Sequence, residues 1–201
     1  MQPNLQLESG DLDLNFYQHQ PYLDSFNEDR KTNIVSLEDS KIFITPLLGF
    51  SSNIKDIKDL KDGGEIIIPN DPTNEARALL ILDKEGLIKL KDKDNLNSTE
   101  VDIVENPKNL KFTAVDAQNI PRVYQDADLA FINPNFAIAN GLDPKNAVIT
   151  EAKDSPYANI VAARSGEENK EVYKKVVKIL QSEESRKYIE DTFKGAVLPT
   201  F

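Results

Sequence analysis

The chain has 201 residues, enough for one large domain or for two small lobes with a sizeable buried core. Hydrophobic residues make up 39% of it and charged residues 29%, which is ordinary for a globular protein and excludes wholesale disorder. The 34 acidic residues outnumber the 24 basic ones, so a formal charge of −10 without any basic run argues against nucleic acid as a partner.

The residue types also limit the chemistry. Cysteine is absent and there is a single histidine, which excludes disulfides, a thiol nucleophile, Cys-ligated metals and His-rich metal sites. There is no Gly-rich phosphate loop, no Gly-x-Ser-x-Gly elbow and no His-Glu-x-x-His motif. No apolar run has the roughly 18 residues of a membrane span, and the first fifteen residues show no leader segment. We therefore expect no catalytic residue, no metal and no cofactor.

Strand-like and helix-like segments alternate along the chain, which predicts an α/β fold. Leu12, Leu14 and Phe16 alternate with polar residues, as on the core face of a half-buried strand. In the first half of the chain the pattern then predicts a helix over 19–30, two apolar runs within 34–50, a strand over 65–69 and a helix over 70–86. The second half predicts strands over 110–115 and 127–133 that flank a helix near 117–125, and then a strand over 157–164. Two helices follow over 169–195, with Val172, Val176, Val177 and Leu180 on one face.

The helix over 70–86 has the clearest end signals. Asp71 is a suitable N-cap, Pro72 fits the first helical position, and Gly86 fits the position after the last turn. These signals predict where the helix begins and ends.

Asn74 and Arg77 lie three residues apart near the start of that helix and so share a face. Unpaired N–H groups at a helix N-terminus, together with a guanidinium group, suit a carboxylate ligand. An exposed Arg77 paired with Asp71 or a neighbouring carboxylate is an equally good interpretation.

The segment NFYQHQPY gathers aromatic residues and the histidine. Tyr17 and His19 are two apart at the end of a predicted strand, where open α/β sheets bind their ligands, and Tyr22 follows within a turn. Together they form a possible aromatic wall with polar tips. From these residues alone, tyrosines packed at a surface and a helix-capping His19 are the favoured interpretation.

Three asparagines complete the candidate polar groups. Asn133 and Asn135 follow an apolar strand and precede a helix-like segment, where turn chemistry is the ordinary explanation. Asn159 lies inside the predicted strand over 157–164, where a primary amide must find hydrogen-bond partners. The oxygens of such amides can accept from an ammonium group, and their N–H groups can donate to a carboxylate.

Six blocks spread along the chain resemble the NlpA family of lipoproteins, the methionine-binding components of bacterial methionine ABC importers. They are QPNLQLESGDLDLNFYQHQPYL, IPNDPTNEARALLILDKEGLIKLKD, DIVENPKNLKF, AFINPNFAIANGL, DSPYANIVAAR and FKGAVLPTF. The resemblance runs in unbroken order from Gln2 to Phe201.

The resemblance implies a periplasmic-binding-protein-like (type II) fold, with lobe I at 1–48 plus 153–201 and lobe II at 49–152. It implies that methionine, L or D, or a methionine-containing dipeptide binds between the lobes. It also implies a role for each site residue: an aromatic wall for the thioether (Tyr17, His19, Tyr22), a carboxylate clamp (Asn74, Arg77), and amides that hold the amino-acid backbone (Asn133, Asn159).

The resemblance also implies an extracytoplasmic protein with an N-terminal lipid on the cell membrane and an ABC transporter permease as partner. The lipidated cysteine is absent from this chain, and so is the strand–helix–strand that family members carry before the segment matching Gln2. We therefore expect an incomplete lobe I, and a dimer or an exchange of elements between copies is one way to cover its open edge.

Two other functions stay open at this stage. A hydrolase would use His19 as general base, but the sequence names neither a nucleophile nor an orienting acid for it. A surface lipoprotein with a contact or adhesion role, in which ligand binding is vestigial, is the alternative to import.

Overall fold

The computed structural model describes residues 2–152, 155–193 and 195–201. It divides the chain into two compact units, Met1–Thr45 with Lys153–Phe201 (unit 1) and Pro46–Ala152 (unit 2). We expected the second segment of lobe I to begin at residue 153, which lies outside the described residues.

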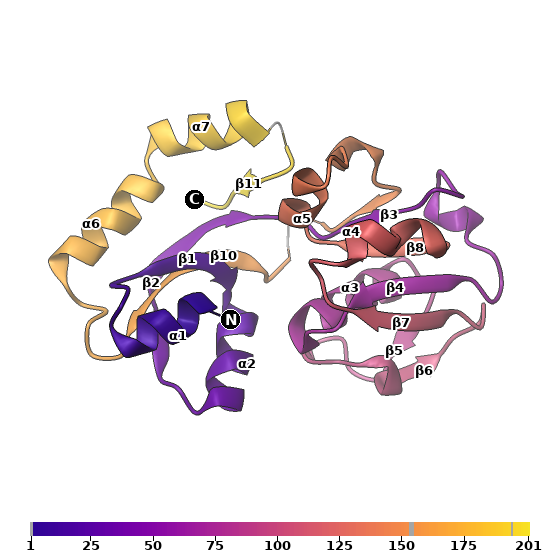
Figure 1. Cartoon of the computed structure of the whole chain (residues 1–201), viewed down its shortest axis with the longest axis horizontal. Helices are drawn as coiled ribbons and strands as arrows, with labels where there is room; N and C mark the ends of the chain where they lie inside the picture. The colour runs from indigo at the N-terminus through magenta and orange to yellow at the C-terminus, as the bar shows by residue number, and fades with distance from the viewer. Residues whose placement is uncertain (1, 153–154, 194) are drawn as a thin grey trace. The chain divides into compact units, whose positions relative to one another are not determined.

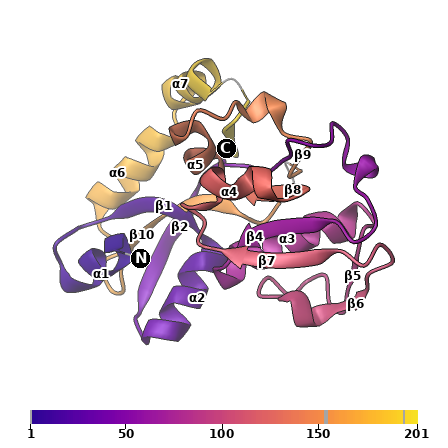
Figure 2. The ribbon, with the colours of Figure 1, turned by 45° about the vertical axis from the view of Figure 1, so that its right-hand side comes forward.

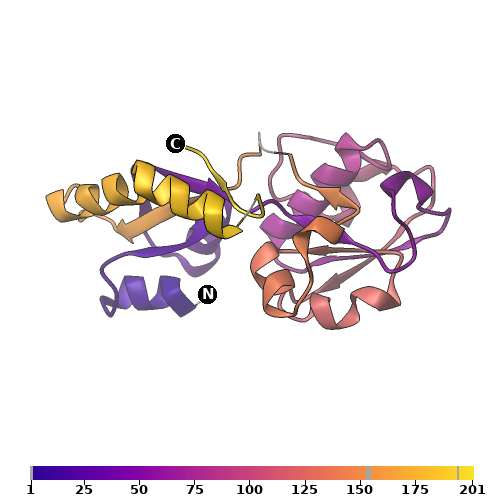
Figure 3. The same cartoon turned by 90° about the horizontal axis from the view of Figure 1, so that it is seen from above.

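Unit 1 is built on a four-stranded antiparallel sheet in the order β1-β10-β2-β11. Figure 1 shows α1 and α2 on one side of this sheet and α6 on the other, and Figure 3 shows α6 and α7 following one another. The strands are β1 (Asn15–His19), β2 (Ile34–Ile44), β10 (Ala158–Arg164) and β11 (Leu198–Pro199), and the helices are α1 (Gln2–Ser9), α2 (Gln20–Arg30), α6 (Glu171–Leu180) and α7 (Glu183–Phe193).

Each face of the unit 1 sheet has its own apolar core, because the side chains of β10 alternate between the two faces. Ile160 and Ala162 pack with α1 and α2, while Val161 and Ala163 pack with α6. The buried residues of α6 are Tyr173 and Val177. The predicted face of this helix was therefore partly wrong: Val172 is exposed, because it lies about a quarter turn away from that stripe.

The predicted strand around Leu12, Leu14 and Phe16 is also corrected. The strand begins only at Asn15, and the three residues do not share one core: Leu12 packs on the α1–α2 side, and Leu14 and Phe16 on the α6 side. The physical reason is that the backbone N–H of Leu12 bonds back to the carbonyl of Gln6 at 3.1 Å and the chain bends at Asp13, so the alternation of β1 does not extend to Leu12.

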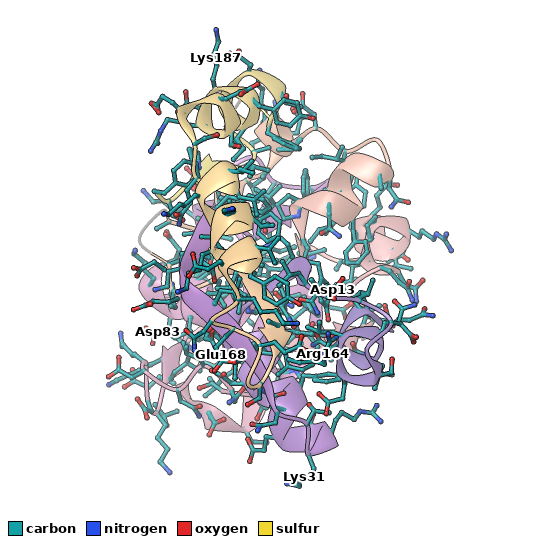
Figure 4. The ribbon with its side chains drawn as sticks, turned by 90° about the vertical axis from the view of Figure 1, so that its left-hand side faces the viewer. Asp13, Lys31, Asp83, Arg164, Glu168 and Lys187 are labelled. Atoms are coloured by element: carbon teal, nitrogen blue, oxygen red, sulfur yellow. The ribbon has the colours of Figure 1, made fainter. Side chains whose placement is uncertain are left out.

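Arg164, at the end of β10, fastens the segment that joins α1 to β1 (Figure 4). Its Nη1 donates hydrogen bonds to the carbonyl oxygens of Leu7 and Leu12, and its Nη2 lies 3.7 Å from a carboxylate oxygen of Asp13. The short helix α1 is thus held by a charged side chain as well as by its buried Leu7.

Unit 2 contains a five-stranded mixed sheet in the order β7-β4-β8-β3-β9, and β5 pairs separately with β6. The pairs of β4 with β7 and with β8 are parallel, whereas β3 runs antiparallel to both of its neighbours. The strands are β3 (Leu48–Phe50), β4 (Glu65–Pro69), β5 (Lys89–Leu90), β6 (Ile103–Glu105), β7 (Lys111–Val115), β8 (Leu129–Ile132) and β9 (Ile149–Thr150), and the α-helices are α3 (Pro72–Lys84), α4 (Ile120–Val123) and α5 (Pro134–Ala139).

Both faces of the unit 2 sheet are buried. Ile66 and Ile68 of β4 pack with α3, whereas Ile67 between them packs on the side of α4 and α5. Figure 2 shows α4 lying along the sheet. Burial of both faces explains why β4 and β8 read as continuous apolar runs. The predicted strands over 65–69 and 127–133 are confirmed, within one or two residues at their ends.

The predicted ends of helix α3 are confirmed. The side chain of Asp71 accepts a hydrogen bond from the backbone N–H of Asn74, and Pro72 opens the first turn. Gly86 has a φ of 71°, and the next N–H, that of Leu87, reaches back to the carbonyl of Leu82 at 3.0 Å, which is a Schellman closure. These two ends fix where Asn74 and Arg77 lie.

Among the described residues, no helix combines the length and apolar character required to cross a membrane.

Candidate functional site

The candidate residues of unit 1 form one aromatic cluster at the junction of β1 and α2. The ring of Tyr22 lies 6.3 Å from that of Tyr17 and 6.2 Å from that of His19, both edge-to-face. The ring of Tyr157, just before β10, adds a closer edge-to-face contact with His19 at 4.9 Å. The structure thus brings together the three predicted aromatic residues and adds a fourth that the sequence interpretation missed.

His19 is the N-cap of α2, as the interpretation favoured from the residues alone predicted. Its Nδ1 accepts the backbone N–H of Tyr22 at 3.2 Å, so the ring proton resides on Nε2. His19 is 6% exposed, whereas Tyr17 is 37% exposed. Capping and membership of the aromatic cluster are therefore compatible roles for the same side chain.

The phenol of Tyr17 stays protonated at physiological pH. Burial, and secondarily the neighbouring Tyr22, raises the pKa of Tyr17 well above its ordinary value. A neutral phenol contributes an apolar ring with a hydrogen-bonding tip, which suits contact with a small organic ligand.

A buried amide network supports β1 below the aromatic cluster. Asn4 of α1 donates to Gln18 at 2.8 Å and accepts from both Gln18 and Asn15 at 2.8 Å. All three side chains are nearly inaccessible to solvent. The network spans the register irregularity of β1 and so fixes the strand that carries Tyr17 and His19.

Asn159 lies in β10 opposite His19 of β1. It is 9% exposed, and its side-chain amide makes no hydrogen bond with another described residue. A nearly buried amide with no partner among the described residues is uncommon, and a ligand is one way to satisfy it.

The candidate residues of unit 2 begin with Arg77. It is 1% exposed and its Nε lies 2.8 Å from each carboxylate oxygen of Glu151, to which Nη2 also donates. Glu151 in turn accepts the backbone N–H of Leu47 at 2.9 Å. The interpretation of Arg77 as an exposed residue was wrong, although it does pair with a carboxylate.

Glu151 joins two distant stretches of chain. Its backbone N–H donates to the carbonyl of Leu47 at 3.0 Å, so main chain and side chain both bind the same residue. Leu47 and Glu151 lie next to the first and last residues of unit 2, so the ion pair ties Arg77 to both ends of that stretch of chain. Nothing local in the sequence marks Glu151, which is 74 residues away from Arg77.

Asn74 connects two other polar residues. Its Nδ2 lies 3.0 Å from both carboxylate oxygens of Asp71, and its Oδ1 accepts from Asn133 Nδ2 at 3.1 Å. The structure therefore brings Asn74 and Asn133 together. Asn135 makes no side-chain hydrogen bond to a described residue and is exposed on α5.

The contacts of these residues suit ligand binding. The imidazole Nδ1 of His19 is occupied by a backbone N–H. Within the part of the chain that the structure describes, no group of three or more His, Cys, Asp and Glu side chains is placed to hold a metal ion. Both groups of residues are suited to binding a small ligand. Unit 1 offers aromatic rings and an amide, and unit 2 offers a guanidinium group, carboxylates and amides.

Comparison with known proteins gives consistent matches over the whole chain. The chain is 45% identical over 199 residues to the D-methionine-binding lipoprotein MetQ of Salmonella typhi, covering 98% of this chain and 73% of that protein. It is 42% identical to the probable D-methionine-binding lipoprotein MetQ of Pasteurella multocida, covering 98% and 71%.

Solved structures agree. A nutrient-binding protein from Burkholderia cenocepacia bound to methionine has a TM-score of 0.93 and 45% identity, covering all of this chain and 84% of that one. The structure described as the methionine-binding protein MetQ has a TM-score of 0.90 and 41% identity, covering 100% and 82%. The two-lobe periplasmic-binding-protein fold is thereby confirmed. A family model described as NlpA lipoprotein matches residues 1–201, and the chain belongs to the NlpA lipoprotein family.

Proposed function

We propose that this chain is the substrate-binding component of an ABC importer and binds methionine, as the free amino acid or within a dipeptide. Its relatives include D-methionine-binding lipoproteins, and a similar solved structure is bound to methionine. The chain is a binding protein and not an enzyme. The ligand-binding residues that we propose are Tyr17, His19, Tyr22 and Asn159 of unit 1 and Asn74, Arg77 and Asn133 of unit 2.

One observation carries the proposal at the level of chemistry. The aromatic cluster lies beside an amide, that of Asn159, which has no hydrogen-bond partner among the described residues. Aromatic edges are favourable partners for a thioether sulfur, and an amide satisfies the polar end of an amino acid. In unit 2, the side-chain oxygen of Asn133 is likewise buried and has no hydrogen-bond partner among the described residues.

Isothermal titration tests the ligand. We expect L-methionine, D-methionine or a methionine-containing dipeptide to bind, and norleucine, which replaces the sulfur by a methylene, to bind more weakly. Binding of none of the three methionine ligands would contradict the proposal. Asn159→Ala shows whether the amide contributes to binding. The matched control is Asn135→Ala, which removes an exposed amide that bonds to no described residue.

We also propose an ABC transporter permease as the partner and an extracytoplasmic, lipid-anchored location, both by analogy with the lipoproteins of this family. Recovery of methionine uptake when the gene is restored to a deletion strain tests the import role. Unchanged methionine uptake in the deletion strain would favour a contact role at the surface instead.

A dimer is proposed on the basis of β1. Among the described strands, β1 pairs only with β10, and an edge strand presents N–H and carbonyl groups to another chain. Light scattering tests this: a mass of twice 22.6 kDa is expected, and a stable monomer contradicts it.

A further inference from the structure

Asn133 begins helix α5 but does not cap it with its side chain. An N-cap asparagine ordinarily accepts a backbone N–H of the first turn through its side-chain oxygen. Asn133 has the extended backbone of an N-cap, with φ −65° and ψ 137°, yet it makes no such bond. Its Oδ1 is instead buried and has no hydrogen-bond partner in the described chain. A buried acceptor of this kind is left for a donor that none of the described residues supplies.

The orientation of this amide follows from a chain of hydrogen bonds. The carboxylate of Asp71 can only accept, so Asn74 must direct its Nδ2 towards it, at 3.0 Å from both oxygens. The Oδ1 of Asn74 then faces Asn133, which must donate through Nδ2, at 3.1 Å. The Oδ1 of Asn133 is the end of the chain, and turning either amide over would place two acceptors together.

We propose that Asp71 is a positioning residue for ligand specificity: acting through Asn74, it holds Asn133 so that Asn133 presents an acceptor to the ligand. This inference rests on the proposed function. In a zwitterionic amino acid the ammonium group is the strong donor, while the carboxylate only accepts. Asp71 therefore selects ligands that carry an ammonium group, although it touches none of them.

Asp71 also caps helix α3, through the backbone N–H of Asn74 at 3.1 Å, and the test must separate the two roles. Asparagine is as good an N-cap as aspartate. Asp71→Asn therefore keeps the cap but offers Asn74 both a donor and an acceptor. The orientation of the hydrogen-bonded chain Asp71–Asn74–Asn133, called the relay below, is then no longer fixed.

The experiment measures affinity by isothermal titration for L-methionine and for 4-(methylthio)butanoate, which lacks the ammonium group. We expect the unaltered protein to prefer methionine, and Asp71→Asn to reduce that preference about tenfold, the size expected for one hydrogen bond to a charged group. Asn74→Ala keeps the backbone cap and removes the relay, so it should also reduce the preference, and a full preference in this variant overturns the relay even if Asp71→Asn does not fold.

Two further variants sharpen the result. Thr73→Val removes a hydrogen bond to Asp71 of 3.1 Å but leaves the relay intact, so the preference should not change. Asp71→Asn combined with Asn133→Asp reverses the relay, because Asn74 now donates to the new carboxylate at position 133, and should restore the preference.

The outcomes separate the two proposals. If the unaltered protein binds no methionine, the proposed function fails, and the relay with it. If it binds methionine but Asp71→Asn and Asn74→Ala keep the full preference, the relay is wrong and the proposed function stands. An equal loss in Thr73→Val would also overturn the relay, because it would trace the effect to the cap region as a whole.

Discussion

At the scale of single residues, Arg77 depends on Glu151. Both side chains are almost fully buried, and removing one partner of such a pair leaves an uncompensated charge. We expect Glu151→Gln to lower the free energy of unfolding by about 3 kcal/mol in urea denaturation. The control is Glu105→Gln, which breaks the exposed pair with Lys89 and should leave the urea midpoint unchanged. Equal shifts in the two variants would contradict a special role for the buried pair.

Asp128 gives a pH-dependent contribution to stability. The backbone N–H of Glu65, at 2.9 Å, lowers the pKa of this carboxyl below its ordinary value, with help from Lys61. Because the pKa is lower in the folded chain, the stabilisation is complete above the unfolded pKa of about 3.9 and is lost as the pH falls through the folded value. The difference in unfolding free energy between the unaltered protein and Asp128→Asn should therefore be constant from pH 7 to about pH 5 and shrink towards pH 3. A difference that does not change with pH would contradict this.

The candidate residues could be found from the sequence, but their partners could not. The segment NFYQHQPY pointed to Tyr17, His19 and Tyr22, and the resemblance gave them a ligand role; the structure brings the three rings together. Glu151 was missed because an ion pair between residues far apart in the chain leaves no periodic signal. Tyr157 was missed although it lies two residues before Asn159, because a tyrosine ahead of a strand reads as ordinary packing.

At the scale of helices and strands, the sequence predicted best those features that a few neighbouring residues determine. The caps of α3 and the apolar runs of β4 and β8 are of this kind. Helix α1 was not predicted, since it is eight residues long and its buried positions include the polar Asn4. The start of β1 was misplaced because the chain bends at Asp11 and Asp13, and the alternating residues before Asn15 belong to that bend and not to the strand.

The end of α3 offers a prediction about backbone conformation alone. Gly86 has a φ of 71°, and a Cβ at this position would meet no atom within 4 Å. Gly86→Ala should therefore lower the free energy of unfolding by about 1 kcal/mol, purely through the cost of the left-handed conformation. Gly86→Asn should cost less, because asparagine tolerates that conformation. Equal losses in urea denaturation for Ala and Asn would show that steric contact, and not backbone conformation, is responsible.

At the scale of the whole molecule, two units with separate cores should unfold separately. Five of the six tyrosines (Tyr17, Tyr22, Tyr157, Tyr173 and Tyr188) belong to unit 1 and only Tyr124 to unit 2, so tyrosine fluorescence reports mainly on unit 1. Circular dichroism reports on the helices of both units. Without ligand, we expect the two signals to follow different urea transitions.

Methionine should make those transitions coincide. A ligand that binds residues of both units stabilises only the state in which both are folded, by about 2.7 kcal/mol at a hundred times its dissociation constant. The measurement is therefore the same pair of urea titrations with and without saturating L-methionine. Asn159→Ala in unit 1 should weaken methionine binding and so separate the two transitions again, whereas Asn135→Ala should leave them coincident. If methionine shifts one transition and leaves the other in place, the ligand binds one unit alone, and the division of the proposed residues between the two units is wrong.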